Sequence, residues 1–171
     1  MGTLNILEAI KNHQSVKAGV LITSDKCYKN VEQIWGYREN DRIGGDDPYS
    51  ASKACAEIII NSYIQSNALK NKTLIASARA GNVIGGGDWS EDRLVPDCFK
   101  SLFANKLIRV RNPFSTRPWQ FVLDPLKGYL MLGEKLLNGS KEHVGSWNFG
   151  PPQDNVYTVG DVVELITELW G

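Results

Sequence analysis

A buried strand, a long amphipathic helix and a second buried strand follow one another in this 171-residue chain, and this order restricts its fold most. Residues 18–23 and 73–79 are short apolar runs, and residues 48–66 have helical periodicity behind an Asp47-Pro48 cap. Two strands joined by a helix lie parallel, with a right-handed crossover. The pattern therefore predicts an α/β protein with a doubly wound parallel sheet. The buried face of the helix is expected to carry Ala54, Ile58, Ile59 and Tyr63.

The other segments are less regular. Their patterns predict helices at 2–13, 94–104 and 125–138, a glycine-rich loop at 81–88, strands near 107–111, 119–123 and 146–149, and a last helix capped by Thr158. Only two parallel strands are recognisable, and two alone make no stable core. We therefore expect a piece of a larger protein.

Composition narrows the classes of partner. Nineteen basic and nineteen acidic residues give no net charge, which argues against nucleic-acid binding. The three cysteines and two histidines have no disulfide or zinc spacing, which indicates reduced thiols and no metal site. No stretch approaches the roughly 18 apolar residues of a membrane span, and the N-terminus does not resemble a signal peptide. These observations predict a soluble cytoplasmic protein.

The chemistry concentrates around the strand–helix–strand unit. Tyr49 and Lys53 are four residues apart, so they share one face of the helix. A nearby ammonium favours the phenolate form of a tyrosine, which is a base. Such a pair alone is a weak signal, but the segment Thr23–Lys26 follows the first strand at its carboxyl end, where parallel sheets bind ligands. Hydroxyl, carboxylate, ammonium and phenol groups are therefore expected to converge on one pocket.

With Ser24, Tyr49 and Lys53 in these places, the chain resembles the extended short-chain dehydrogenase/reductases, the NAD-dependent epimerases and dehydratases of nucleotide sugars. The members of that family use a Ser/Thr and a Tyr-x-x-x-Lys pair as a catalytic triad. Four segments resemble the CDP-glucose 4,6-dehydratase branch in particular, namely 23–28, 79–89, 117–122 and 147–151. Segment 117–122 departs from that branch by having phenylalanine where histidine is commoner. The resemblance covers nearly the whole chain, and it implies an internal or C-terminal fragment. Residues 1–80 would be the C-terminal part of a Rossmann-like NAD-binding domain, and residues 81–171 mostly a small mixed α/β substrate lobe, interleaved with the first part.

The resemblance implies conversion of CDP-D-glucose to CDP-4-dehydro-6-deoxy-D-glucose and water, with NAD accepting a hydride and returning it. Tyr49 would take the C4 hydroxyl proton, Lys53 would hold the cofactor ribose, and Ser24 would polarise the C4 oxygen. Asp25 would donate a proton to the departing C6 hydroxyl. Lys26 stands where other dehydratases have a carboxylate, and as a desolvated neutral amine it would take the C5 proton.

The resemblance also implies binding residues and a partner. The expected cofactor-binding residues are Thr23, Tyr49, Lys53 and Arg79. The expected substrate-binding residues are Asn82, Arg111, Arg117, Trp119 and Asn148, the arginines being suited to a diphosphate. A homodimer is expected through helices 2–13 and 49–66.

Two other functions stay open. The family's glycine-rich turn and the acidic residue about 20 positions later have no counterpart in this sequence. The chain is therefore expected either to need the missing half for activity, or to be a non-catalytic remnant that binds a nucleotide sugar or a partner chain. Within the enzymes the alternative is a nucleotide-sugar epimerase, in which Asp25 and Lys26 would have no role in elimination.

Overall fold

The computed structural model describes residues 1–13, 15–70, 73–152 and 156–171. The sequence also predicts a turn at residues 70–72, and residues 71 and 72 lie outside the described part. The chain divides into two compact units. Unit 1 comprises Met1–Gly81 and Leu123–Phe149, and unit 2 comprises Asn82–Val122 and Gly150–Gly171. Each unit takes residues from two separate stretches of sequence.

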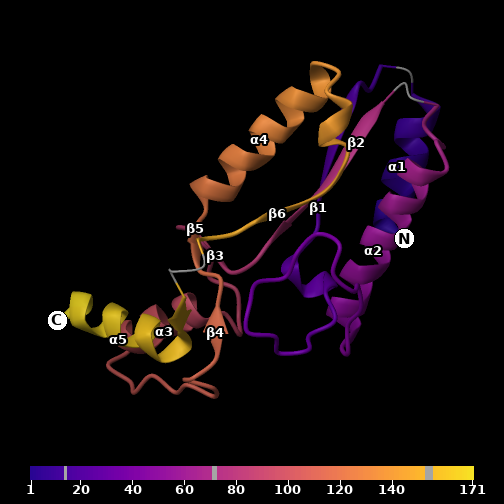
Figure 1. Cartoon of the computed structure of the whole chain (residues 1–171). Helices are drawn as coiled ribbons and strands as arrows, with labels where there is room; N and C mark the ends of the chain where they lie inside the picture. The colour runs from indigo at the N-terminus through magenta and orange to yellow at the C-terminus, as the bar shows by residue number, and fades with distance from the viewer. Residues whose placement is uncertain (14, 71–72, 153–155) are drawn as a thin grey trace. The chain divides into compact units, whose positions relative to one another are not determined.

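A three-stranded parallel sheet forms the centre of unit 1 (Figure 1). Its order is β1 (Ala18–Ile22), β2 (Leu74–Ala80) and β6 (Gly145–Phe149). Both neighbours of β2 run parallel to it. The expectation of only two parallel strands was therefore wrong, because a short run near the end of the chain supplies the third. Periodicity shows that such a run is extended, but it does not identify the strand's partner.

Helices cover both faces of this sheet, as Figure 1 shows. One face carries α1 (Gly2–Asn12) and α2 (Pro48–Gln65), and the other carries α4 (Leu123–Leu137). The predicted α/β class with a partial Rossmann-like, doubly wound parallel sheet is confirmed.

The alternation of side chains along β2 separates two apolar clusters. Ile75 packs with Leu7 of α1 and Ile60 of α2. The next residue, Ala76, points to the opposite face and packs with Leu132 and Leu136 of α4. Burial on both faces explains why strand β2 is an almost continuous apolar run in the sequence.

The helix α2 begins where the sequence predicts. The side chain of Asp47 accepts hydrogen bonds from the main-chain N–H groups of Tyr49 and Ser50, at 2.9 and 3.0 Å, with Pro48 in the first turn. The buried face differs from the prediction at Ile58, which is 59% exposed. Its neighbour Glu57 is buried instead, because it has charged and polar partners on the sheet.

The described residues of unit 2 form two helices and two small sheets. The helices are α3 (Leu94–Phe103) and α5 (Val159–Trp170), and they pack through the ring of Trp170 against Phe99 and Phe103. The sheets are the parallel pair β3 (Val83–Ile84) and β5 (Gln120–Phe121), and the antiparallel pair β4 (Thr116–Arg117) and β7 (Tyr157–Thr158). Thr158 caps α5 as predicted, in a capping box with Asp161.

The strand expected near 107–111 does not form among the described residues. Leu107 is 90% exposed, so the alternation of this segment has no apolar surface to cover. No helix in the described part of the chain is long and apolar enough to cross a bilayer.

We predict that Leu7→Ala lowers the free energy of unfolding by about 2–5 kcal/mol, because it opens a cavity between α1, α2 and β2. Chemical denaturation monitored by circular dichroism measures the change. Leu107→Ala, the same change at a side chain that is 90% exposed, is the matched control and should change it by about 0.5 kcal/mol or less. Equal losses for the two variants would contradict the assigned core.

Candidate active site

The segment after β1 lies against the helix α2. Ser24 caps a short 3-10 helix, η1 (Asp25–Cys27), and its Oγ accepts a hydrogen bond from the Lys26 N–H at 3.2 Å. The same hydroxyl donates to Asp25 Oδ1 at 2.9 Å. The helix η1 packs against α2. Hydrogen bonds from Ser50 lower the pKa of Asp47, and the ammonium of Lys26 adds to this effect. The predicted residues 24–26 therefore lie beside the start of α2.

Tyr49 and Lys53 form the predicted pair on the first turns of α2. The Lys53 Nζ lies 5.6 Å from the centroid of the Tyr49 ring. The Tyr49 side chain is 54% exposed, while Ser24 is buried. A solvent-open phenol beside an ammonium is suited to take a proton from a bound alcohol.

The loop between η1 and α2 returns tightly to the helix. Gly44 donates its N–H to the Cys27 carbonyl at 2.9 Å. A Cβ on Gly45 would lie 2.5 Å from the Cβ of Ser50, so only glycine fits between the loop and α2. Burial raises the pKa of Cys27 to about 12, which keeps it a thiol at neutral pH and unsuited to nucleophilic attack.

Arg79, predicted to bind the cofactor, is a buried residue of β2 with 4% exposure. Its Nη2 donates to Glu57 Oε2 at 2.6 Å. Its Nη1 donates to the Tyr28 hydroxyl at 2.6 Å and to the Glu39 carbonyl at 3.0 Å. The guanidinium therefore contacts α2 and the loop after η1.

Asn148 and Thr23 also have protein partners. The Asn148 Oδ1 accepts from the Tyr28 hydroxyl at 2.7 Å, and its Nδ2 donates to the Tyr37 carbonyl at 2.8 Å. The Thr23 hydroxyl donates to Glu57. The side chains of Thr23, Arg79 and Asn148 thus join the strand ends to the residues around them.

The other predicted substrate residues, Asn82, Arg111, Arg117 and Trp119, belong to unit 2. Arg117 lies in β4, and Trp119 lies between β4 and β5. The indole N–H of Trp119 donates to the Tyr157 carbonyl at 3.2 Å. Arg111 is exposed and pairs with Asp92 at 2.7 Å. The structure thus divides the predicted residues into one set in each unit.

The sequence prediction missed Glu57, a buried residue of unit 1 that accepts hydrogen bonds from Thr23, Ser77, Arg79 and Ser146. A signal was present, because Glu57 follows Lys53 by four residues within a mostly apolar stretch, and Arg79 ends a buried strand. Charged side chains are almost never fully buried unless they are paired. Two opposite charges in adjacent buried elements therefore indicate an ion pair.

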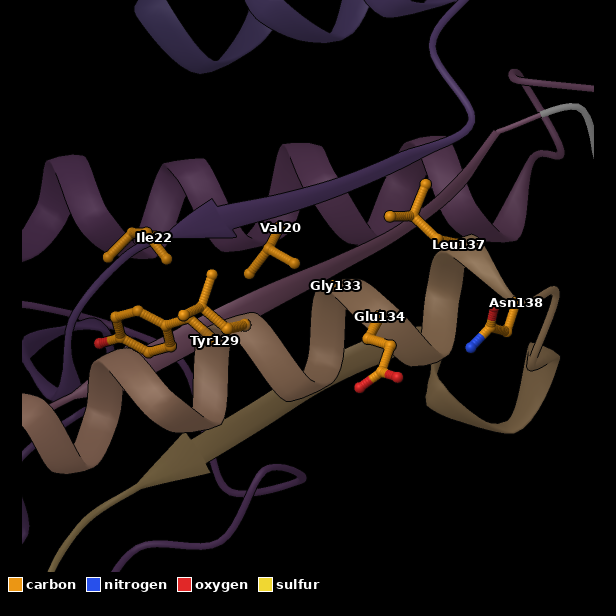
Figure 2. Close-up of a pocket in the computed structure, with 8 residues that line it drawn as sticks. Val20, Ile22, Tyr129, Gly133, Glu134, Leu137 and Asn138 are labelled. Carbon is orange, nitrogen blue, oxygen red and sulfur yellow. The ribbon is translucent and has the colours of Figure 1, made fainter.

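A groove of about 550 Å³ lies between β1 and α4 (Figure 2). Val20 and Ile22 line it from β1, and Tyr129, Gly133 and Leu137 line it from α4. None of the predicted site residues lines this groove. Within the described residues, no three His, Cys, Asp or Glu side chains gather as metal ligands would. The candidate active site is therefore the edge where η1 meets α2.

We predict that Glu57→Gln lowers the free energy of unfolding by about 3–5 kcal/mol, because it leaves the Arg79 guanidinium buried without a counter-charge. Denaturant titration measures the loss. The control, Asp92→Asn, makes the same chemical change in an exposed ion pair and should cost less than about 1 kcal/mol. Similar costs for both would show that burial does not govern the Glu57–Arg79 pair.

A pH dependence of stability follows from the same carboxyl group. Burial raises the pKa of Glu57, but hydrogen bonds from Arg79 and Thr23 outweigh this effect and hold the pKa below its ordinary 4.5. The unfolded chain therefore binds this proton at higher pH than the folded chain does. The stability that Glu57 contributes is present above pH 4.5 and is lost as the pH falls through the folded-state pKa.

The test is denaturation at several pH values from about 7 to about 3. The wild-type chain should lose more stability over this range than Glu57→Gln, which has no carboxyl group at this position. If stability changes with pH in the same way in both proteins, the assignment of this pH dependence to Glu57 is contradicted.

A family model described as GDP-mannose 4,6 dehydratase matches residues 1–164. The chain is 47% identical to the CDP-glucose 4,6-dehydratase of Salmonella typhimurium, over 100% of this chain and 49% of that protein. The chain therefore spans about half the length of this relative.

Solved structures share the fold. A dTDP-glucose 4,6-dehydratase from Bacillus anthracis, in complex with NAD, superposes with a TM-score of 0.79 at 24% identity, covering 98% of this chain and 50% of that one. A UDP-glucose 4-epimerase from Thermus thermophilus, also with NAD, gives a TM-score of 0.80 at 23% identity, covering 99% and 53%. Since the family match extends over nearly all of the sequence, the chain belongs to the GDP-mannose 4,6 dehydratase family.

Proposed function

We propose that this chain carries the catalytic residues of a CDP-glucose 4,6-dehydratase. One observation carries the proposal: the Lys53 ammonium lies 5.6 Å from the centre of the exposed Tyr49 ring, on a helix that packs against the Ser24–Asp25 turn. The choice of CDP-glucose is supported by the 47% identity to the Salmonella enzyme. The reaction removes water from C5 and C6 of the sugar.

Each residue at this edge has a role in the proposal. Tyr49, as the phenolate, takes the proton of the C4 hydroxyl, and Ser24 donates a hydrogen bond to the C4 oxygen. Once C4 has also lost its hydride, it is a ketone, and this ketone makes the C5 proton acidic. Lys26 takes that proton once the bound sugar has desolvated its amine. Asp25 gives a proton to the departing C6 hydroxyl.

The same residues suit one end of NAD, which when bound would accept a hydride from C4 and return it at C6. A solvent-open phenol and a half-buried ammonium on one helix face fit the ribose hydroxyls beside a nicotinamide. We therefore propose Tyr49 and Lys53 as cofactor-binding residues. Thr23 and Arg79 would support this end of the site through Glu57 of the same helix, because both of their side chains donate hydrogen bonds to its carboxylate.

We assign the sugar-nucleotide contacts mainly to unit 2. Arg111 and Arg117 offer planar donors for a diphosphate, and Asn82 offers an amide that adds no charge. Trp119 provides an aromatic surface for the nucleotide. Asn148 belongs to unit 1, where its amide already supports the loop after η1.

We further propose a homodimer through α1 and α2, in the cytoplasm. The exposed side chains of Ile6 on α1 and Ile58 on α2 favour such a contact. The three cysteines, all within the described residues, are free thiols, as in a reducing compartment.

A second candidate is a non-catalytic remnant that binds a nucleotide sugar or a partner chain. An epimerase is the alternative within the enzymes, since an epimerase shares the fold. The product distinguishes the three functions, because a dehydratase removes water, an epimerase leaves the mass unchanged, and a remnant makes no product.

We predict that the purified chain, given CDP-glucose and NAD, converts the sugar nucleotide to a product lighter by one water. Tyr49→Phe should abolish this conversion, because it removes the hydroxyl that takes the C4 proton. Mass spectrometry of the nucleotide sugar measures both outcomes.

The matched control is Tyr63→Phe, the same change on the same helix, where the hydroxyl donates to Glu8. The Tyr63→Phe variant should form the dehydrated product as the wild type does. An unchanged mass with the wild-type chain would reject dehydration by this chain. Binding of CDP-glucose, measured by calorimetry, would then separate a binding remnant from a chain that does not recognise the sugar.

A further inference from the structure

Glu57 joins one helix to all three strands of the parallel sheet. Its side chain is 2% exposed. Its Oε1 accepts from the Thr23 hydroxyl that follows β1. Its Oε2 accepts from three groups, namely Arg79 Nη2 at 2.6 Å and Ser77 Oγ at 2.8 Å, both on β2, and Ser146 Oγ at 3.1 Å on β6. Four donors thus reach this carboxylate, and three of them converge on Oε2.

Glu57 lies on the same helix as the proposed catalytic pair, at a regular spacing from both residues. Tyr49, Lys53 and Glu57 follow one another at intervals of four, so they lie along one side of α2. At the rise of an α-helix, Glu57 is about 6 Å from Lys53 and about 12 Å from Tyr49 along the axis. Fixing Glu57 therefore fixes both the rotation and the height of the turns that carry the phenol and the ammonium.

The other proposed reacting groups are held from the same point. Thr23, which donates to Glu57, directly precedes Ser24 in the chain. Arg79 extends the connection to the loop after η1, through the Tyr28 hydroxyl and the Glu39 carbonyl. One buried ion pair thus sets the position of the helix, the serine turn and the loop with respect to one another.

The geometry points to Glu57 and Arg79 as positioning residues, which place Tyr49 and Lys53 relative to Ser24 for proton transfer. This inference rests on the proposed function and deepens it. A role in stability alone is a poor explanation, because buried ion pairs are often replaced by apolar residues at little cost. The Arg79 Nε is also a buried atom with no hydrogen-bond partner among the described residues, which a pair selected only for stability would avoid.

The neighbours of the pair have other partners that an apolar replacement would leave in place. Ser77 Oγ lies 3.0 Å from Ser146 Oγ, the Thr23 hydroxyl lies 3.5 Å from the Ala78 carbonyl, and Tyr28 keeps its bond to Asn148. The double variant Glu57→Leu/Arg79→Met is therefore expected to fold, with no buried charge left unpaired.

The test compares this double variant with Glu57→Asp, which keeps the charge but shortens the side chain, and with the control Ser146→Ala. We expect kcat for CDP-glucose to fall about 10²-fold in the double variant with KM little changed, since misplacement of reacting groups costs turnover more than binding. Glu57→Asp should show a smaller loss of the same kind. Ser146→Ala removes only the longest bond to the carboxylate, so its kcat should stay near the wild-type value.

The melting temperature of each variant separates positioning from stability. A double variant that recovers both the wild-type melting temperature and the wild-type kcat would overturn the inference. If the double variant does not fold, Glu57→Asp decides alone, and wild-type kcat in that variant would overturn it.

A second measurement does not depend on turnover. We expect the amides of residues 51–57 to exchange with deuterium about ten-fold faster in the double variant than in the wild type, with those of α4 unchanged. If the wild-type chain removes no water from CDP-glucose, the proposed function fails, and this exchange decides the positioning role by itself. Equal exchange at residues 51–57 in both proteins would then reject it.

Discussion

The buried ion pair between Glu57 and Arg79 is the constraint on which the rest of unit 1 depends. Desolvating two charges is costly, and the cost is recovered only when nearly every lone pair and N–H finds a partner. The partners come from the ends of β1 and β6, from β2 and from the loop after η1. These hydrogen bonds therefore join segments that are far apart in the sequence. The two apolar clusters pack on opposite faces of the same sheet.

In the proposed function, one helix carries both a fixed residue and a reactive one. At its centre, α2 holds the buried, hydrogen-bonded carboxylate of Glu57, and at its start it presents a phenol that is open to solvent. A group that exchanges protons with a substrate must be accessible, whereas its position must be defined to a fraction of an ångström. A helix meets both needs, because its hydrogen-bonded backbone transmits the position of the buried turn to the exposed one.

Much of this arrangement was predictable from local patterns. The cap at Asp47, the spacing of Tyr49 and Lys53 and the apolar run of β2 each depend on neighbours a few residues away. The errors occurred where distant segments decide. The partner of β2 at 145–149, the exposure of Ile58 and the absence of a strand at 107–111 all depend on which surfaces meet in the folded chain. The ligand-binding roles of Arg79 and Asn148 stay predictions, and only the folded chain shows that their side chains also bond to protein groups.

The sequence by itself determined the strand–helix–strand unit, the helix caps and the residue types at the strand end, because helix and turn chemistry act over three or four residues. The tertiary structure alone decided that a third strand completes the sheet and that Glu57 and Arg79 form a buried pair. The physical reason is that burial is a property of surfaces brought together in space. A charge in an apolar segment shows that it needs a partner, but only the folded chain shows which partner it has.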